Sequence, residues 1–196
     1  MKNSISIIAA ILAVFAIVPY LIDVVSSRTK PNVVSWFTWT LLLIIATAAA
    51  FAAHQPRTAL LTLGDTIGTG MTLIFGIKYG VAKFSWFDGF CQIAALIGLA
   101  LWLIFNSPVV AIIAVIIIDL FASIPTLKHS WQSPEEETWQ TFAILIVAAA
   151  LTLASLANFS IASLSFPIYL LLANSTVVAT VIYRRNKKGL SLSRQK

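Results

Sequence analysis

Charged residues are scarce in this sequence. Only 10% of its 196 residues are Asp, Glu, Lys or Arg, whereas a soluble domain carries about 25%. Hydrophobic residues make up 59% of the chain. A soluble core cannot hide this much apolar surface, so lipid must be the solvent for most of it. No polar stretch is long enough to form a separate soluble domain, so we expect residues 1–196 to form a single membrane domain.

Cysteine and histidine are also rare. The single cysteine, Cys91, excludes an intramolecular disulfide and argues against a thiolate metal cluster. His54 and His129 are predicted near opposite membrane faces, so they cannot share a metal ion. The chain has neither a His-Glu-x-x-His motif nor a Gly-x-Ser-x-Gly turn. We therefore do not expect an enzyme, and we assign no catalytic residue, no metal ligand and no cofactor.

Long apolar runs dominate the rest of the chain. A helix needs roughly 20 apolar residues to cross the hydrocarbon core of a bilayer. Seven stretches qualify, at about 5–25, 34–53, 58–78, 86–105, 108–128, 138–157 and 161–183. Prolines and polar clusters separate them, as breakers of helices do. The sequence therefore predicts an all-α membrane protein with seven transmembrane helices, although a cleaved signal peptide is a rival interpretation of the first run.

The positive charges predict how the chain lies in the membrane. Cytoplasmic loops are enriched in Lys and Arg. With the N-terminus outside, the inner segments hold 11 Lys and Arg residues and the outer segments hold only Lys2 and Arg57. We therefore expect an outer N-terminus, a cytoplasmic C-terminus with a basic tail at 186–196, and a bacterial inner (plasma) membrane. The net charge of +6 lies at the ends of apolar runs, which indicates contact with the lipid bilayer and not with nucleic acid.

Two parts of the chain resemble each other. Pro19 lies near the inner end of the first predicted helix and Pro125 near the inner end of the fifth, and the helices that follow open with Trp36 and Trp139 after a hydroxyl residue. We therefore predict two three-helix repeats, at 5–80 and 108–185, joined by a linker helix at 86–105. An odd number of spans between them makes the repeats parallel, related by an axis along the membrane normal.

With these features the chain resembles the PQ-loop superfamily, which includes the SWEET transporters. The resemblance rests on Pro19-Tyr20-Leu21-Ile22-Asp23, on the basic loop Arg28-Thr29-Lys30 and on Val34-Ser35-Trp36, with a looser second copy at Pro125-Thr126-Leu127-Lys128. The name-giving glutamine is replaced by Tyr20 and by Thr126. The resemblance implies a SWEET-like arrangement of three, one and three helices, hinges for gating at Pro19 and Pro125, and an asparagine of the third helix that faces the substrate, here Asn174.

Polar residues inside the predicted spans are the candidates for a binding site, because polar groups at that depth are costly and are usually functional. Asn174 lies near the middle of the seventh span, and its counterpart in the third is near Thr69, with Thr66 on the same helix. Asp119 lies in the middle of the fifth span and Asp65 in the third. For each of them a structural hydrogen bond or a packing seam is the alternative role.

The sequence thus predicts a transporter of a small polar solute, a sugar or another metabolite, that works by alternating access. Asp119 offers one route to coupling with protons. A non-transporting membrane receptor or sorting protein on the same fold is the alternative. The expected partners are the solute and the bilayer, and a homo-oligomer is compatible with the sequence. Trp36, Trp39, Trp139 and Phe142 are expected to anchor the helices at the interface, and Glu135–Glu137 to form the acidic first turn of the sixth helix.

Overall fold

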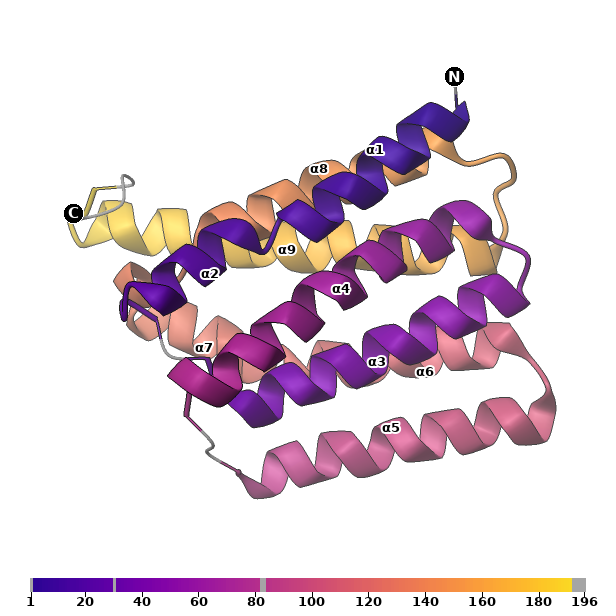
Figure 1. Cartoon of the computed structure of the whole chain (residues 1–196), viewed down its shortest axis with the longest axis horizontal. Helices are drawn as coiled ribbons and strands as arrows, with labels where there is room; N and C mark the ends of the chain where they lie inside the picture. Colours follow the sequence, from indigo (N-terminus) through magenta and orange to yellow (C-terminus); the bar gives the residue numbers. More distant parts are fainter. Residues whose placement is uncertain (1, 30, 82–83, 192–196) are drawn as a thin grey trace.

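The computed structural model of the chain describes residues 2–29, 31–81 and 84–191, and nearly all of them are helical. The helices lie side by side in one bundle (Figure 1). Their bounds are α1 Lys2–Phe15, α2 Val18–Val25, α3 Val33–Ala52, α4 Pro56–Tyr79, α5 Trp86–Phe105, α6 Pro108–Ala122, α7 Ile124–Gln132, a 3₁₀ turn at Pro134–Glu136, α8 Trp139–Ser155 and α9 Ile161–Lys187.

The predicted all-helical membrane protein is confirmed at this level. Among the described residues, six helical stretches are long and apolar enough to cross a membrane, with α1 and α2 forming one and α6 and α7 another. The seventh, α8, has 17 residues, which is the short limit for a spanning helix. One expectation was wrong: Glu135–Glu137 do not open a helix, because α8 begins at Trp139 and the glutamates lie in and after the 3₁₀ turn.

Two of the long helical stretches are interrupted near a proline, the first between α1 and α2 and the second between α6 and α7. The first breaks at Ala16–Ile17, and Pro19 lies in the first turn of α2. The second breaks at Ser123, and Pro125 lies in the first turn of α7. Proline has no N–H to donate to the carbonyl four residues earlier, and its ring crowds that carbonyl, so a helix stops or bends at this point.

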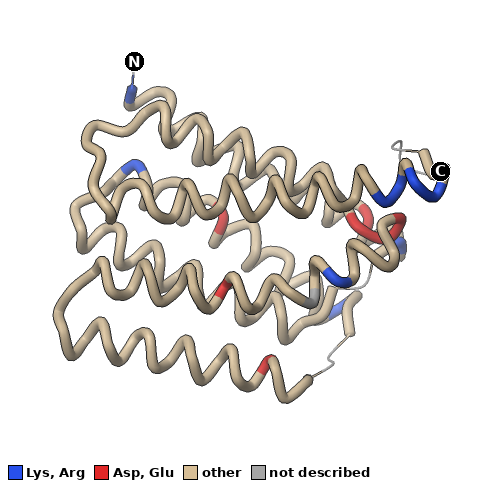
Figure 2. The backbone as a smooth tube through the Cα atoms, turned by 180° about the vertical axis from the view of Figure 1, so that it is seen from behind, with Lys and Arg blue, Asp and Glu red and all other residues tan. Residues whose placement is uncertain are grey.

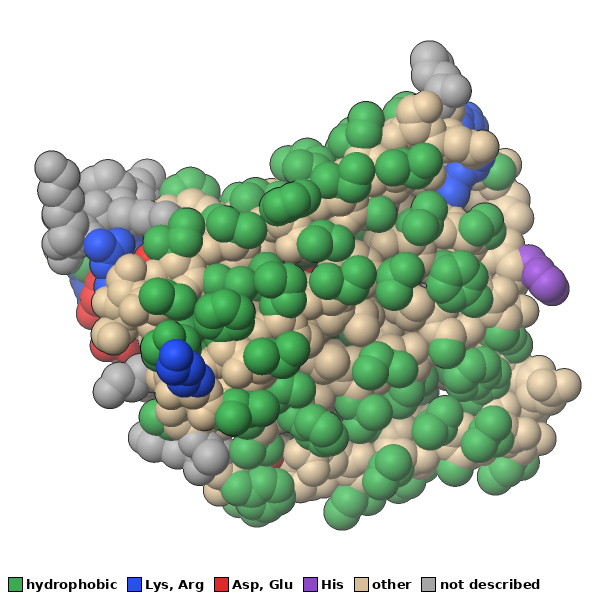
Figure 3. Space-filling model, viewed as in Figure 1, with side chains coloured by type: hydrophobic (Ala, Val, Ile, Leu, Met, Phe, Trp, Pro, Cys, Tyr) green, Lys and Arg blue, Asp and Glu red, His purple; other side chains and the backbone are tan. Residues whose placement is uncertain are grey.

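The bundle has two ends, which we call the Lys2 end, where α1 begins, and the Lys187 end, where α9 ends. The basic residues divide unequally between them (Figure 2). Of the nine Lys and Arg residues that the structure describes, Lys2 and Arg57 belong to the Lys2 end and seven to the Lys187 end. Between the ends the visible face of the molecule is covered with hydrophobic side chains (Figure 3), as a surface in contact with lipid would be.

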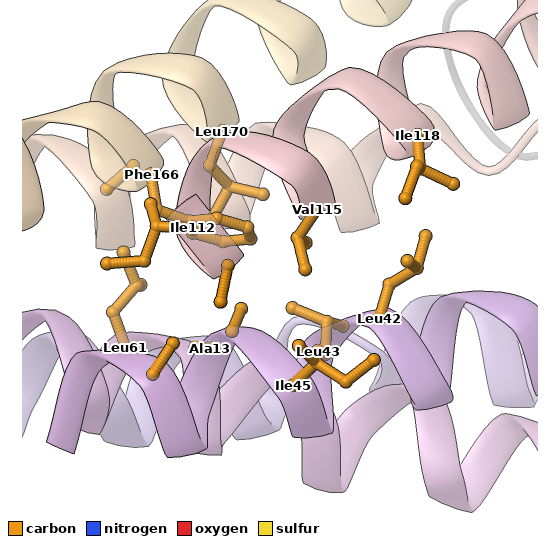
Figure 4. Packing of buried hydrophobic residues seen from close by; sticks show 14 of the residues in the cluster. Ala13, Leu42, Leu43, Ile45, Leu61, Ile112, Val115, Ile118, Phe166 and Leu170 are labelled. Carbon is orange, nitrogen blue, oxygen red and sulfur yellow. The ribbon is translucent and has the colours of Figure 1, made fainter. Parts of the chain in front are cut away.

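The helices pack in a simple pattern. α4 lies between α1 and α3, and α9 lies between α6 and α8. α1 also packs against α8, and α3 against α6. α5 lies at the edge, against α6 and α3, with a narrow buried strip of small residues, Cys91, Ala95 and Gly98. This arrangement encloses a core in which side chains from α1, α3, α4, α6 and α9 meet (Figure 4).

A proline inside α9 explains one buried hydrogen bond between distant parts of the chain. Pro167 cannot donate to the carbonyl of Ser163. The hydroxyl of Thr58 on α4 donates to that carbonyl instead, at 2.9 Å. In a membrane no water is present to do so, and an unsatisfied carbonyl would cost several kcal/mol by rough estimate. The interaction therefore allows α9 to run unbroken through a proline.

Gly64 brings α4 close to α1. A Cβ atom at this position would lie 2.5 Å from the carbonyl oxygen of Ala10 and 3.0 Å from the Cβ of Ala13. Four residues later on α4, a Cβ atom at Gly68 would lie 3.5 Å from its nearest neighbour, a side-chain atom of Ile17. Small residues four apart allow such close packing of membrane helices, but only Gly64 is under a tight steric limit.

We predict that Gly64→Ala destabilises the protein, by about 1–3 kcal/mol as is typical of overpacking. Gly68→Ala is the matched control and should be neutral within about 0.5 kcal/mol, because its new methyl group makes an ordinary contact. Thermal unfolding of both purified variants checks this. Equal midpoints for the two variants would show that α1 and α4 are not held together at Gly64.

Candidate functional site

A cavity of about 190 Å³ lies in the middle of the bundle. Side chains from α3, α4, α6, α7, α8 and α9 line it. The cavity extends from the middle of α4 and α9 toward the Lys187 end. Most of its wall is apolar, from Leu, Val, Ile and aromatic side chains. The polar side chains on it are Asp65, Thr69, Asp119, Ser123, Thr126, Thr141, Tyr169, Asn174 and Thr176.

Asp119 and Tyr169 form the shortest polar contact at the cavity. The Tyr169 hydroxyl on α9 donates to the Asp119 carboxyl group on α6, at 2.6 Å. Tyr169 also packs edge to face against Phe166, with ring centroids 6.0 Å apart. The hydrogen bond fixes one oxygen of Asp119 and leaves the other without a hydrogen-bond partner among the described residues.

Asn174 and Thr69 face the same cavity from opposite helices. Both are buried, and both use the carbonyls of their own helix. The Asn174 amide donates to the Leu170 carbonyl at 2.7 Å, and the Thr69 hydroxyl donates to the carbonyls of Asp65 and Thr66, each at 3.1 Å. The carbonyl oxygen of the Asn174 side chain accepts no hydrogen bond from the described residues, so it is available to a bound molecule.

Two further polar groups on the cavity wall have no partner. The Asp65 side chain is 7% exposed, and none of the described residues forms a hydrogen bond or an ion pair with its carboxyl group. The buried Thr141 hydroxyl is likewise unpaired in the part of the chain that the structure describes. Buried polar groups without partners are rare and usually have a functional cause.

The structure brings four of the five predicted binding residues together, since Asn174, Thr69, Asp119 and Asp65 all line the cavity. Thr66 does not line it. Its hydroxyl donates to the Thr62 carbonyl at 2.7 Å and lies 3.3 Å from the Thr47 hydroxyl of α3. It follows Asp65 directly on α4, and one residue turns a helix by about 100°, so Thr66 points into the seam between α3 and α4.

The predicted hinges lie beside the site and not in it. Pro19 lies in the first turn of α2, two residues after Ile17, which contributes to the cavity wall. Pro125 lies in the first turn of α7, directly before Thr126, which also lines the cavity. A change of angle at either break would therefore move a part of the wall.

Aromatic residues lie between the cavity and a second space toward the Lys187 end, a position that the sequence did not reveal. Trp36, Trp39 and Phe142 were expected to be interface anchors, but they line both the cavity and a second space of about 520 Å³ beyond it. The ring centroid of Trp36 lies 5.0 Å from that of Tyr20 and 5.1 Å from that of Trp39. The Trp and Phe residues recur at matching places in the two halves, and that signal could have identified them.

The space beyond these rings forms a vestibule at the Lys187 end. It is lined by Tyr20, Arg28, His129, Glu136 and Glu137 among others. The hydroxyl of Thr138 donates to one carboxylate oxygen of Asp23 at 2.8 Å. The other oxygen of Asp23 lies 3.6 Å from the Arg28 guanidinium. These contacts join the loop after α2 to the loop before α8 on one side of the vestibule.

The C-terminal part of α9 holds the loop between α7 and α8. The buried Arg185 guanidinium donates to the carbonyls of Pro134, Glu135 and Glu137 at 2.9, 3.3 and 3.2 Å. Lys188 donates to the carbonyl of Gln132 at 2.8 Å and pairs with the Glu135 carboxylate at 3.3 Å. The planar guanidinium suits this role, because it presents several donors in one plane to a row of carbonyl oxygens.

Glu137 is the ionisable group in this loop with the most altered environment. Burial raises the pKa of Glu137 to about 7, although hydrogen bonds from the Ser130 hydroxyl and the Thr138 backbone and the nearby Arg185 charge act in the opposite direction. The Ser130 hydroxyl lies 3.2 Å from the carboxyl group. This burial could not be predicted from the sequence, because Glu137 is the last of three consecutive glutamates.

Within residues 2–29, 31–81 and 84–191, no three His, Cys, Asp or Glu side chains lie close enough together to hold a metal ion. Comparison with protein families, with curated proteins and with solved structures finds no match for this chain. The geometry of the cavity is therefore the basis for inferring a function.

We predict a pH-dependent stability difference between the protein and its Glu137→Gln variant. The folded state holds the Glu137 proton more tightly than the unfolded state, because its pKa rises from 4.5 to about 7 on folding. The carboxyl group therefore stabilises the fold below about pH 4.5 and loses that contribution as the pH rises through 7, at about 1.4 kcal/mol per unit of pKa difference. Glutamine stays neutral, so the variant should gain stability relative to the parent across this range.

Thermal unfolding of the purified proteins between pH 4 and 8 measures this difference. Glu136→Gln is the matched control: the Glu136 side chain is 58% exposed and its carboxylate lies 3.3 Å from His129 Nε2, so its removal should change stability by no more than about 1 kcal/mol. A stability difference between Glu137→Gln and the parent that stays constant with pH would contradict the buried state of Glu137.

Proposed function

We propose that this chain is a carrier for a small polar solute, which binds in the central cavity and reaches it alternately from the two sides of the membrane. The observation that carries the proposal is a cavity at the middle of an apolar bundle whose wall holds unpaired polar groups. Binding sites of secondary transporters lie near the bilayer midplane between repeated units. The Lys187 end is proposed to face the cytoplasm, because it holds most of the basic residues.

The packing of the helices supports two equivalent units, α1–α4 and α6–α9 with α5 as the linker. The third helix of each unit lies between the first and the second, as α4 between α1 and α3 and α9 between α6 and α8. Between the units, the first helix of one packs against the second helix of the other, in both combinations. A two-fold rotation about the membrane normal would produce this pattern. It agrees with the proposed relation to the PQ-loop superfamily.

The register of buried residues supports the same relation. The breaks that interrupt the first helices have related sequences, Phe15-Ala16-Ile17-Val18-Pro19 and Phe121-Ala122-Ser123-Ile124-Pro125. Buried positions of α4 and α9 match at a constant spacing. The pairs are Thr58 with Ser163, Leu61 with Phe166, Thr62 with Pro167, Asp65 with Leu170, Thr69 with Asn174, Thr72 with Val177 and Gly76 with Val181. Thr69 and Asn174 are thus equivalent positions on opposite walls.

The alternating movement is assigned to the two proline breaks. The Lys2 side of the cavity is closed by tightly packed residues such as Leu61, Ile112 and Phe166, whereas aromatic rings separate it from the vestibule at the Lys187 end. Small rotations at Pro19 and Pro125 would move Ile17 and Thr126 relative to the rest of the wall. Asp119 is the group assigned to carry a proton in a coupled cycle, since it lies on the cavity wall and accepts a hydrogen bond from the Tyr169 hydroxyl.

Asn174→Ala tests the proposal. We expect the variant to fold normally and to lose uptake at least tenfold, because the side chain bonds only to its own helix and its amide oxygen is a free acceptor on the cavity wall. Ser175→Ala on the same helix is the control, since Ser175 is absent from the cavity wall, and should transport normally.

Uptake and counterflow in proteoliposomes are to be measured with a panel of labelled sugars, amino acids, amines and organic acids. Normal uptake by Asn174→Ala would remove the site from the mechanism. A complete panel in which no solute crosses would favour the alternative, a receptor or sorting protein that binds without transporting.

A further inference from the structure

The cavity wall has an uneven charge. Two carboxyl groups face it, those of Asp65 on α4 and Asp119 on α6, and they lie near enough to each other to interact electrostatically. Among the described residues that line the cavity there is no Lys, Arg or His. Every basic residue that the structure describes belongs to one of the two ends of the bundle. The cavity therefore contains the groups of an anionic site and no counter-charge from the described residues.

Asp65 is the group that packing does not explain. A structural aspartate in a membrane helix normally bonds to a neighbouring helix or to a cation, but Asp65 has no such partner among the described residues and is more than nine-tenths buried. Asp119 differs, because Tyr169 holds one of its oxygens at 2.6 Å. Asp65 thus points into the cavity with both oxygens available to a ligand.

The rest of the wall decides what kind of cation fits. A Ca²⁺ or Mg²⁺ ion takes about six or more oxygen ligands, whereas this wall is mainly hydrocarbon and aromatic. Trp36, Trp39, Phe142 and Phe166 all line the cavity. Aromatic faces attract an ammonium group and also pack against an apolar body. An organic ammonium ion satisfies both features, while a free sugar would leave the carboxyl groups without a counter-charge.

We propose that the central cavity binds a small organic monocation, an amine or quaternary ammonium on an apolar or aromatic body, with Asp65 as its counter-ion and the Trp36 and Trp39 rings against its body. The inference rests on the proposed carrier function and names the substrate class for the same cavity. Asn174 and Thr141 on the opposite wall offer an amide oxygen and an unpaired hydroxyl to polar groups of the cation.

The test compares three probes that share one aromatic body: benzyltrimethylammonium, benzyl alcohol and phenylacetate. Binding to the purified full chain is followed by quenching of tryptophan fluorescence, since Trp36 and Trp39 line the cavity. We expect saturable binding of the cation and at least tenfold weaker binding of the neutral and anionic probes. Equal binding of the three probes, or preference for the anion, would overturn the proposal.

Substitutions then locate the counter-ion. Asp65→Asn should weaken binding of the cation at least tenfold, while Asp65→Glu, which keeps the charge, should retain it. Asp88→Asn is the matched control and should bind as the parent does, because Asp88 caps α5 at the membrane edge and does not line the cavity. Unchanged affinity in Asp65→Asn would show that this carboxyl group is not the counter-ion.

The proteoliposome assay separates this inference from the carrier proposal. If a sugar or an organic acid crosses in an Asn174-dependent manner and the cation does not bind, the carrier proposal stands and the cation is wrong. If the cation binds in an Asp65-dependent manner and no solute crosses, the site stands and the carrier proposal fails. Uptake of the cation that is lost in Asp65→Asn supports both.

Discussion

The structure depends on one constraint: the hydrocarbon around the bundle offers no hydrogen bonds, so each polar group must find a partner inside the protein or line an internal space. Threonines satisfy it within their own helices, as the Thr38, Thr62 and Thr72 hydroxyls do by donating to carbonyls four residues earlier. Where a helix lacks a donor at Pro167, a second helix supplies one from Thr58. Even the exposed Thr176 hydroxyl follows this pattern, since it donates to the Leu172 carbonyl of its own helix at 2.8 Å.

The same constraint accounts for the site. Asp65, Asp119, Thr141 and Asn174 each have at least one side-chain polar atom without a hydrogen-bond partner among the described residues, and all four line one cavity. Their cost is acceptable only if something else pairs with them when the cavity is occupied. If these positions served packing alone, apolar residues of similar volume would be more favourable there, since a buried unpaired polar group lowers the stability of the fold.

The sequence predicted the features that follow from hydropathy and chain direction. The helices begin and end within a few residues of the predicted spans, because apolar runs and prolines mark them directly. Four residues of the cavity wall could be identified from the sequence, because a polar side chain in an apolar span must face the interior of the bundle or pay a high cost in lipid. They are Asn174, Thr69, Asp119 and Asp65. The features that the sequence did not reveal concern direction around a helix axis and long-range contact. Thr66 faces α3, Trp39 lines the cavity, and the hydrogen bond between Tyr169 and Asp119 joins residues 50 positions apart.

The central claim is that one cavity opens to both sides of the membrane, and cysteine accessibility tests it most directly. Ala173 lines the cavity, so Ala173→Cys in a Cys91→Ala background places one thiol on its wall. A membrane-impermeant thiol reagent is applied to sealed vesicles from the outside and, in inverted vesicles, from the inside. The account predicts labelling from both sides, slowed in both cases by a bound solute. Labelling from one side only, or from neither, would contradict it.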